Sequence, residues 1–125
     1  MTRLLVDTHA LLWWLMDDDG LSDTARAALA DPANDVLVST ASVWEIAIKR
    51  GLGKLEAPDD LLDHIEAQGF GWLPVGAAHA WHVWDLPPHH RDPFDRLLVA
   101  QALVDGVPLV SVDPQLDPYG VTRLW

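Results

Sequence analysis

The sequence predicts an α/β fold with a parallel sheet and helices on both of its faces. Short apolar runs alternate along the chain with segments of helical periodicity, which is the pattern of successive βαβ units. Clusters of turn-forming residues separate these segments, and neither a repeat nor a linker divides the chain. The length of 125 residues, half of them hydrophobic, is enough for one core, so we expect a single domain over residues 1–125.

In the first half of the chain, two strands and three helices are expected. An apolar run predicts a strand at residues 4–6, and a helical pattern follows at 10–16 until the Asp-Asp-Asp-Gly cluster ends it. Ser22 is a typical N-cap for a helix at 23–30. Residues 36–39 form the second expected strand, and a helix at 41–50 ends at a glycine.

The second half continues the alternation. A proline and an aspartate open a helix that ends near residue 69, and a strand is expected at 72–75. A helical stretch at 77–84 precedes a double-proline loop. The helix at 93–105 has the clearest signals, with Asp92 as N-cap, Pro93 in the first turn and Gly106 after the end. Strands are expected at 107–112 and 121–124.

Composition excludes several classes of protein. The chain has no cysteine, which rules out a disulfide framework and thiolate zinc sites. No apolar run approaches the roughly 20 residues that cross a bilayer, and the N-terminus lacks the pattern of a signal peptide. We therefore expect a cytoplasmic protein with no membrane contact. The formal net charge of −11 argues against non-specific binding of nucleic acid, so a nucleic-acid substrate would need local positive charge.

Four carboxylates stand in segments that otherwise have the composition of buried elements. These residues are Asp7, Glu45, Asp95 and Asp113. A carboxylate in such a place needs a hydrogen bond, an ion pair or a cation, because burying an unpaired charge is costly. Few basic residues lie beside the four in sequence, and a metal ion is therefore the expected partner.

The predicted topology brings the four acids to one edge of the sheet. Asp7 and Asp113 follow the ends of strands, and Asp95 lies in the first turn of its helix. Ligands of open α/β sheets bind at the carboxyl ends of the strands. Glu45 lies one turn deeper in its helix, but helical side chains lean toward the N-terminus and glutamate is long.

Helical spacing predicts that two of these acids face the core. Asp95 heads a stripe formed by residues 98, 99, 102 and 103, and Glu45 shares a stripe with residues 41, 48 and 52. Structural explanations exist for each acid alone: Asp95 complements the helix dipole, and Glu45 pairs with Lys49 at i+4. They do not extend to all four, because the sequence supplies no cation for each. For Asp92, capping is the preferred explanation.

Four segments carry a resemblance to a known family. They are VDTHALLWWL at residues 6–15, STASVWEIAIK at 39–49, HRDPFDRLLVAQA at 90–102, and the closing LVSVD and YGVTRLW. In this order, over essentially the whole chain, they resemble the PIN domain family and, within it, the ribonuclease toxins of VapBC toxin–antitoxin pairs. The resemblance implies a three-layer αβα sandwich with a five-stranded parallel sheet, and a Mg²⁺- or Mn²⁺-dependent endoribonuclease.

The resemblance also implies which residues form the site. The acidic positions of the family correspond to Asp7, Glu45, Asp95 and Asp113, and its small hydroxyl positions to Thr8, Ser42 and Ser111. Ser111 stands where many relatives have threonine. An antitoxin with a basic, aromatic-bearing tail is the implied protein partner, beside the RNA substrate. A homodimer is also expected.

The chemistry of the residues leads to the same ion. Carboxylate oxygens select Mg²⁺ or Mn²⁺ over zinc, and such an ion activates water for attack on a phosphodiester. We expect Asp7 as the central metal ligand with Asp95 and Asp113 as further ligands, while Glu45 binds metal or orients the water. The three hydroxyl residues are expected to hold these carboxylates.

Basic and aromatic residues suggest contacts with RNA and with protein partners. Lys49, Arg91 and Arg96 lie near the acids in sequence and are the candidate substrate-binding residues, although solvated lysine and arginine side chains are an equally good explanation for each one. His90 is a further candidate for substrate contact. The spacing of His79, His82 and Asp85 suggests a second metal site only weakly, since no further histidine completes it. The seven tryptophans fit a core, an antitoxin groove or a homodimer face.

Two other functions remain open from the sequence. A receiver-like phosphoacceptor domain also gathers acids and Mg²⁺ at a strand edge, but it normally has an adjacent acidic pair after the first strand, where this chain has Val6 and Asp7. A catalytically inactive PIN-like binding module is the other alternative. Convergence of the four carboxylates would favour the nuclease.

Overall fold

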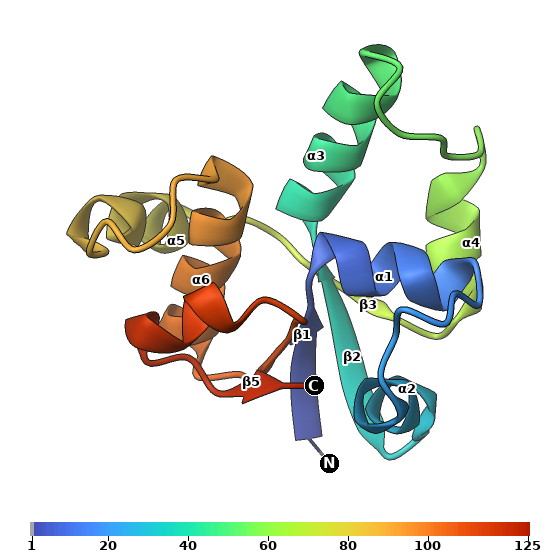
Figure 1. Cartoon of the computed structure of the whole chain (residues 1–125), viewed down its shortest axis with the longest axis horizontal. Coiled ribbons are helices and arrows are strands. Elements are labelled where there is room, and N and C mark those ends of the chain that lie inside the picture. The colour runs from blue at the N-terminus through green and yellow to red at the C-terminus, as the bar shows by residue number, and fades with distance from the viewer. Residues whose placement is uncertain (1) are drawn as a thin grey trace.

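The computed structural model describes residues 2–125, and these form one five-stranded sheet with helices around it (Figure 1). All strand pairs are parallel, in the order β3-β2-β1-β4-β5, which confirms the predicted α/β class. The strands are β1 (Thr2–Val6), β2 (Asn34–Ser39), β3 (Gly71–Leu73), β4 (Leu109–Val110) and β5 (Arg123–Leu124). The helices are α1 (Thr8–Leu15), α2 (Asp23–Ala30), α3 (Thr40–Gly51), α4 (Leu61–Ala67), α5 (Ala77–His82) and α6 (Pro93–Asp105), with short 3₁₀ helices η1 (Val83–Asp85) and η2 (Pro114–Tyr119).

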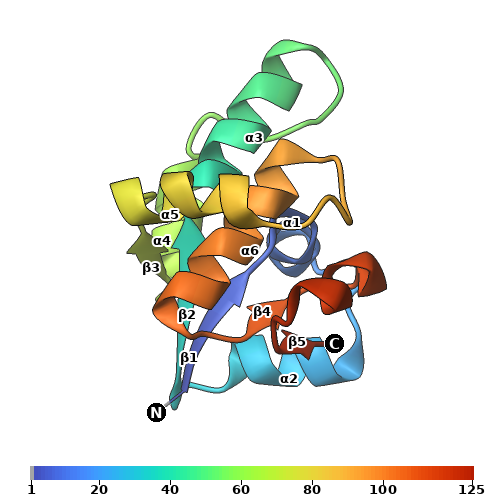
Figure 2. The same ribbon diagram turned by 90° about the vertical axis from the view of Figure 1, so that its left-hand side faces the viewer.

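Alternating side chains of the central strand divide the core into two layers. Leu4 and Val6 pack into a cluster with residues of α1, α2 and α4, whereas Leu5 packs into a second cluster with residues of α6 and η2. Figures 1 and 2 show α1, α2 and α4 on one side of the sheet and α5 and α6 on the other. The result is the expected three-layer αβα sandwich.

Several elements are shorter than the sequence predicts. Strand β3 stops at Leu73, because Pro74 has no N–H for the ladder, and β4 is reduced to two residues after Pro108. Helix α4 begins at Leu61, three residues after the proline expected to open it. Helix α1 begins earlier than expected, at Thr8, because Asp7 is its N-cap. The first strand therefore passes into the first helix at Asp7 without a loop.

The stripe predicted for α3 is only half correct. Ala41 and Glu45 are buried, but Ile48 and Leu52 are exposed, and Ile46 fills the core instead. The second half of α3 extends beyond the sheet edge (Figure 1), so no neighbouring layer covers that part of the stripe. Glu45 lies at the point where the helix leaves the core.

Helix α6 follows its sequence signals closely. Asp92 caps it by accepting hydrogen bonds at Oδ1 from the backbone N–H groups of Phe94 (2.8 Å) and Asp95 (3.1 Å). Gly106 ends it in the left-handed region, at φ 65°, where glycine is favoured. None of the helices between residues 2 and 125, α6 included, is long and apolar enough to cross a membrane.

Candidate active site

Asp7 lies at the carboxyl end of β1 and is almost fully buried, with 5% of its surface exposed. Its Oδ1 accepts a hydrogen bond from the backbone N–H of Ala10 (2.8 Å), as an N-cap does. Burial raises the pKa of this carboxyl above its usual range, while hydrogen bonds from Ser111 and Ala10 oppose that shift. The fold therefore stabilises the charged form of Asp7 only in part.

Hydroxyl groups support the acids from neighbouring elements. The Thr8 hydroxyl donates to the Ser42 hydroxyl (3.0 Å) and joins the first turns of α1 and α3. Ser111 acts to lower the pKa of Asp7, and its hydroxyl accepts a hydrogen bond from the backbone N–H of Asp113 (3.2 Å). All three hydroxyl residues are buried at this edge of the sheet.

Glu45 projects from α3 and is 2% exposed. Its Oε2 accepts from Nζ of Lys49 (2.5 Å), the i+4 ion pair that the sequence left open. Its other carboxylate oxygen, Oε1, is buried and has no hydrogen-bond partner within residues 2–125. A buried carboxylate oxygen without a donor is unusual and indicates a missing partner.

Asp95 lies in the first turn of α6 and faces the other acids. Burial raises its pKa to about 6, and the negative charges of Asp92, Asp7 and Glu45 add to the shift. Asp7 and Glu45 are therefore close enough to Asp95 to raise its pKa, and Glu45 also contributes to the raised pKa of Asp7. A raised carboxyl pKa beside like charges is a common property of functional sites.

Asp113 follows β4 and caps η2, accepting at Oδ1 from the backbone N–H of Gln115 (2.9 Å). Its Oδ2 lies 3.1 Å from Nε2 of His90, and the same nitrogen lies 3.3 Å from Oδ2 of Asp95. His90, Asp95 and Asp113 each bring a ligand-type atom within 4.8 Å of the others. Among the described residues these three form the one group of at least three such side chains that meets this distance.

The structure adds detail to the expected site. Lys49 pairs with Glu45, which is the structural explanation that the sequence left open for this acid. Asp113 lies with His90 and Asp95 in the group of close ligand atoms, and Asp7, expected as the central metal ligand, is not part of that group. His90 is the site residue that sequence reasoning undervalued, because neither its spacing nor its neighbours distinguish it from an ordinary loop histidine.

The three candidate RNA-binding residues differ in their surroundings. Arg91 is exposed, and Lys49 is half-buried beside Glu45. The Arg96 guanidinium donates to five oxygens of the loop and of η2: the carbonyls of Val83, Leu86, Pro87 and His90 and the hydroxyl of Tyr119. This geometry favours a structural role for Arg96.

A second metal site at His79, His82 and Asp85 is not among the potential metal-binding groups of residues 2–125. His79 instead accepts at Nδ1 from the backbone N–H of Gly76 (2.9 Å) and places Nε2 3.0 Å from Oδ1 of Asp105. It joins α5 to the end of α6 and is buried.

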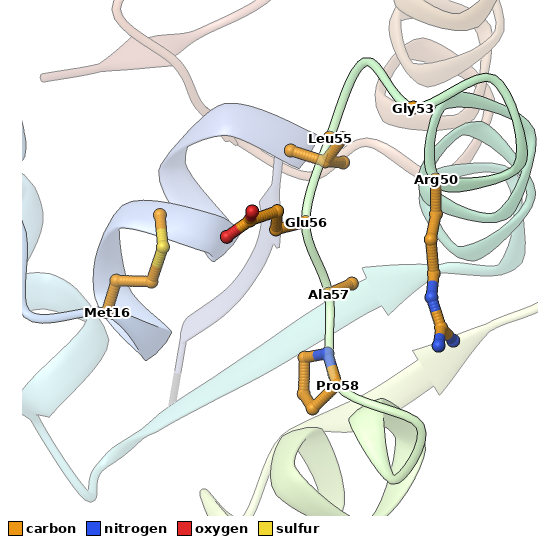
Figure 3. A pocket seen from close by; sticks show the side chains of 7 residues that line it. All are labelled: Met16, Arg50, Gly53, Leu55, Glu56, Ala57 and Pro58. Atoms are coloured by element: carbon orange, nitrogen blue, oxygen red, sulfur yellow. The ribbon is translucent and has the colours of Figure 1, made fainter.

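A line of hollows leads away from Glu45. A cavity of about 270 Å³ beside Glu45 and Lys49 shares Leu55 with a larger one of about 710 Å³. Figure 3 shows the larger cavity around the loop at residues 53–58, with Met16 on one side, Arg50 on the other and Glu56 pointing toward α1. A third hollow of about 200 Å³ continues from it along α1 and α4.

The profile of the PIN domain family matches residues 4–120. The chain belongs to the PIN domain family. Its acid edge thus lies in a PIN domain, and the expected family is confirmed.

Two relatives from Mycobacterium tuberculosis resemble the chain in sequence. Ribonuclease VapC22 is 31% identical over 123 residues, covering 93% of this chain and 91% of the relative. Ribonuclease VapC16 is 40% identical over 68 residues, covering 51% of this chain and 48% of the relative.

Solved structures share the fold of this PIN domain. A DNA-bound VapBC from Salmonella typhimurium superimposes with a TM-score of 0.72 at 16% identity, covering 98% of this chain and 97% of that chain. VapC20 of Mycobacterium tuberculosis, described as a toxin that cleaves the sarcin-ricin loop, gives a TM-score of 0.63 at 17% identity, covering 94% and 95%.

The residues of this edge fit a divalent cation. Carboxylate oxygens are the ligands that Mg²⁺ and Mn²⁺ prefer. The unpartnered Oε1 of Glu45 and the raised pKa values of Asp7 and Asp95 both reflect negative charge that the protein leaves uncompensated. A bound cation would give Oε1 of Glu45 a partner and would lower the pKa values of Asp7 and Asp95.

Proposed function

We propose that this PIN domain, spanning residues 1–125, is a Mg²⁺- or Mn²⁺-dependent endoribonuclease and the toxin of a type II toxin–antitoxin pair. The observation that carries the proposal is the gathering of Asp7, Glu45, Asp95 and Asp113 at the carboxyl edge of the sheet. The relatives named as ribonucleases supply the reaction class. RNA as substrate also implies a cytoplasmic location.

The acids and the hydroxyl residues have different proposed roles, according to their positions. Asp7, Asp95 and Asp113 would hold the metal, which would supply an activated water and neutralise charge on the phosphate. Glu45, through its free oxygen, would bind the metal or accept a hydrogen bond from the attacking water. Thr8, Ser42 and Ser111 keep the carboxylates in place.

Substrate contacts are proposed for the basic residues near this edge. Arg91 is exposed and lies between His90 and the cap of α6, where a phosphate would reach it. Lys49 keeps its charge, because the neighbouring Glu45 raises its pKa, and it remains partly accessible. Arg96, predicted from sequence to bind RNA, is better placed to hold the loop that carries His90.

The proposal is tested by cleavage of total RNA. Wild type should cut with Mg²⁺ or Mn²⁺ and stop cutting in EDTA. Asp7→Asn should not cut, because asparagine keeps the shape of the side chain but removes the charged metal ligand. Asp19→Asn, at an exposed acid in the turn after α1, is the matched control and should cut like wild type. Cleavage by Asp7→Asn at the wild-type rate would refute the nuclease, and a folded wild type that never cuts would favour the inactive binding module.

An antitoxin is the proposed protein partner. Its basic, aromatic-bearing tail would cross the acid edge and continue along the hollows beside Leu55 and α4. The net charge of −11 of the whole chain would attract such a tail. Co-expression of the neighbouring antitoxin should suppress RNA cleavage. Unchanged cleavage in its presence would count against this partner.

A homodimer is also proposed. Trp81 and Trp84 are 74% and 70% exposed and lie against each other, with ring centroids 6.1 Å apart. Trp44, also exposed, contacts Phe94 edge to face at 5.3 Å. Exposed tryptophans are typical of protein interfaces. Light scattering should give twice the mass of the chain, and a monomer at all concentrations would contradict the dimer.

A further inference from the structure

The His90 side chain reaches into the acid edge with a single nitrogen. Its Nε2 is 3.1 Å from Oδ2 of Asp113 and 3.3 Å from Oδ2 of Asp95. The two carboxylates come from different elements, the end of β4 and the first turn of α6. The imidazole thus occupies the space between two of the acids assigned to the metal.

The other ring nitrogen determines which one carries the hydrogen. Nδ1 of His90 accepts a hydrogen bond from the backbone N–H of Asp92 at 3.1 Å, so it bears no hydrogen itself. The hydrogen of the neutral ring is then on Nε2, where it is donated to Asp113 and Asp95. A histidine that binds metal through Nε2 needs its hydrogen on Nδ1, which would face the Asp92 N–H donor. In this position the ring is therefore a donor to the carboxylates and a poor metal ligand.

The backbone around His90 is held by two side chains from outside the loop. The His90 N–H donates to the Tyr119 hydroxyl (2.8 Å), and the His90 carbonyl accepts from Nη1 of Arg96 (3.3 Å). Nη1 of Arg96 also donates to the Tyr119 hydroxyl (3.1 Å). These bonds fix where the ring is attached, so its position between the carboxylates is built into the fold.

We propose that His90 is a positioning residue that competes with the metal: its Nε2–H bridges Asp95 and Asp113 in the metal-free protein and must withdraw before a cation binds both carboxylates. The inference rests on the proposed metal-dependent function. Its consequence is that the acids stay ordered without metal and that metal binds more weakly than it would to the acids alone.

The first test measures direct binding of Mn²⁺ in the absence of RNA. The electron paramagnetic resonance signal of free Mn²⁺ serves as the readout. His90→Phe keeps a planar ring but removes the donor, and it should bind Mn²⁺ about tenfold more tightly, the equivalent of one lost hydrogen bond to a charged group. His90→Gln, whose amide reaches the Nε2 position, should bind like wild type. His79→Phe removes the comparable histidine far from the acids and should leave Mn²⁺ affinity unchanged.

Weaker binding by His90→Phe would mean that His90 is a metal ligand, and equal binding would mean that the ring is a bystander. Either result overturns the inference but not the nuclease, which the RNA-cleavage assay of Asp7→Asn decides separately.

The second test uses the wild-type chain and does not depend on a folded variant. Long-range ¹H–¹⁵N correlation spectra should show hydrogen on Nε2 and none on Nδ1 of His90 in EDTA. Addition of Mg²⁺ should shift both ring nitrogens of His90 and leave those of His79 in place. Hydrogen on Nδ1 in the metal-free protein, or a His90 ring unaffected by saturating Mg²⁺, would refute the competition.

Discussion

His79 and His90 make the same two kinds of hydrogen bond but face different numbers of acids. Each ring accepts a backbone N–H at Nδ1, from Gly76 and Asp92 respectively, and each faces carboxylate with Nε2. His79 meets one carboxylate, Asp105, in a pair that joins α5 to α6. His90 meets two, and the charges of further acids reach the same place.

The difference shows that a histidine–carboxylate contact can stabilise the fold at His79 and yet leave a binding site available at His90. One donor and one carboxylate compensate each other, so the His79 pair has nothing left to bind. At the acid edge the donors are too few, as the unpartnered Oε1 of Glu45 shows. Surplus negative charge, rather than the histidine itself, distinguishes the candidate active site.

The largest expected effect separates the two regions by activity. Asp95→Asn should lower the rate of RNA cleavage on the order of a hundredfold or more, because a charged metal ligand is lost. His79→Phe should cleave at nearly the wild-type rate. Rates of cleavage of a labelled RNA by both purified variants measure this. The comparison breaks if His79→Phe loses as much activity as Asp95→Asn while remaining folded.

Stability should show the reverse order. His79→Phe leaves the Gly76 N–H and the Asp105 carboxylate without their partner, so the free energy of unfolding should fall by about 1–3 kcal/mol. Asp7→Asn should melt in EDTA at the wild-type temperature or above it, since asparagine also caps a helix and removes a buried charge. Thermal melts in EDTA provide both values. A variant Asp7→Asn that melts well below wild type would make Asp7 a structural residue.

Metal should stabilise only a chain with an intact acid edge. At a Mn²⁺ concentration of 100 times the dissociation constant, wild type should gain about 2.7 kcal/mol by mass action. His79→Phe should gain the same amount from its lower starting point, and Asp7→Asn much less. Melting curves with and without Mn²⁺ test this, and an equal gain in Asp7→Asn would place the metal elsewhere.

The smallest effect concerns pH. The pKa of Asp95 is raised to about 6 in the folded state, above the usual value of 3.8, so between these values the folded state binds more protons than the unfolded state. The free energy of unfolding in EDTA should therefore increase as the pH falls from 7 to 5, and the raised pKa of Asp7 acts in the same direction. Asp95→Asn should reduce this increase. An increase of equal size in Asp95→Asn would assign the pH dependence to other groups.

The sequence by itself predicted the fold class correctly and singled out the four acids of the candidate site. The signals at α6 were local, since Asp92, Pro93 and Gly106 act within one turn of the helix ends, and the structure confirms all three. Asp7 was found because a polar residue after a buried strand depends only on the strand pattern. The ends of β3 and β4 were predicted less accurately, because Pro74 and Pro108, which have no N–H, shorten both strands.

Only the tertiary structure decided how the acids are compensated. Whether Lys49 turns to Glu45 or to solvent depends on where α3 leaves the core, and that point also made half of its predicted stripe wrong. His90 reaches Asp113 across 23 residues of chain because Tyr119 and Arg96 hold its loop. Periodicity describes one element at a time, so contacts made between elements by single side chains leave no pattern in the sequence and appear only when the layers pack together.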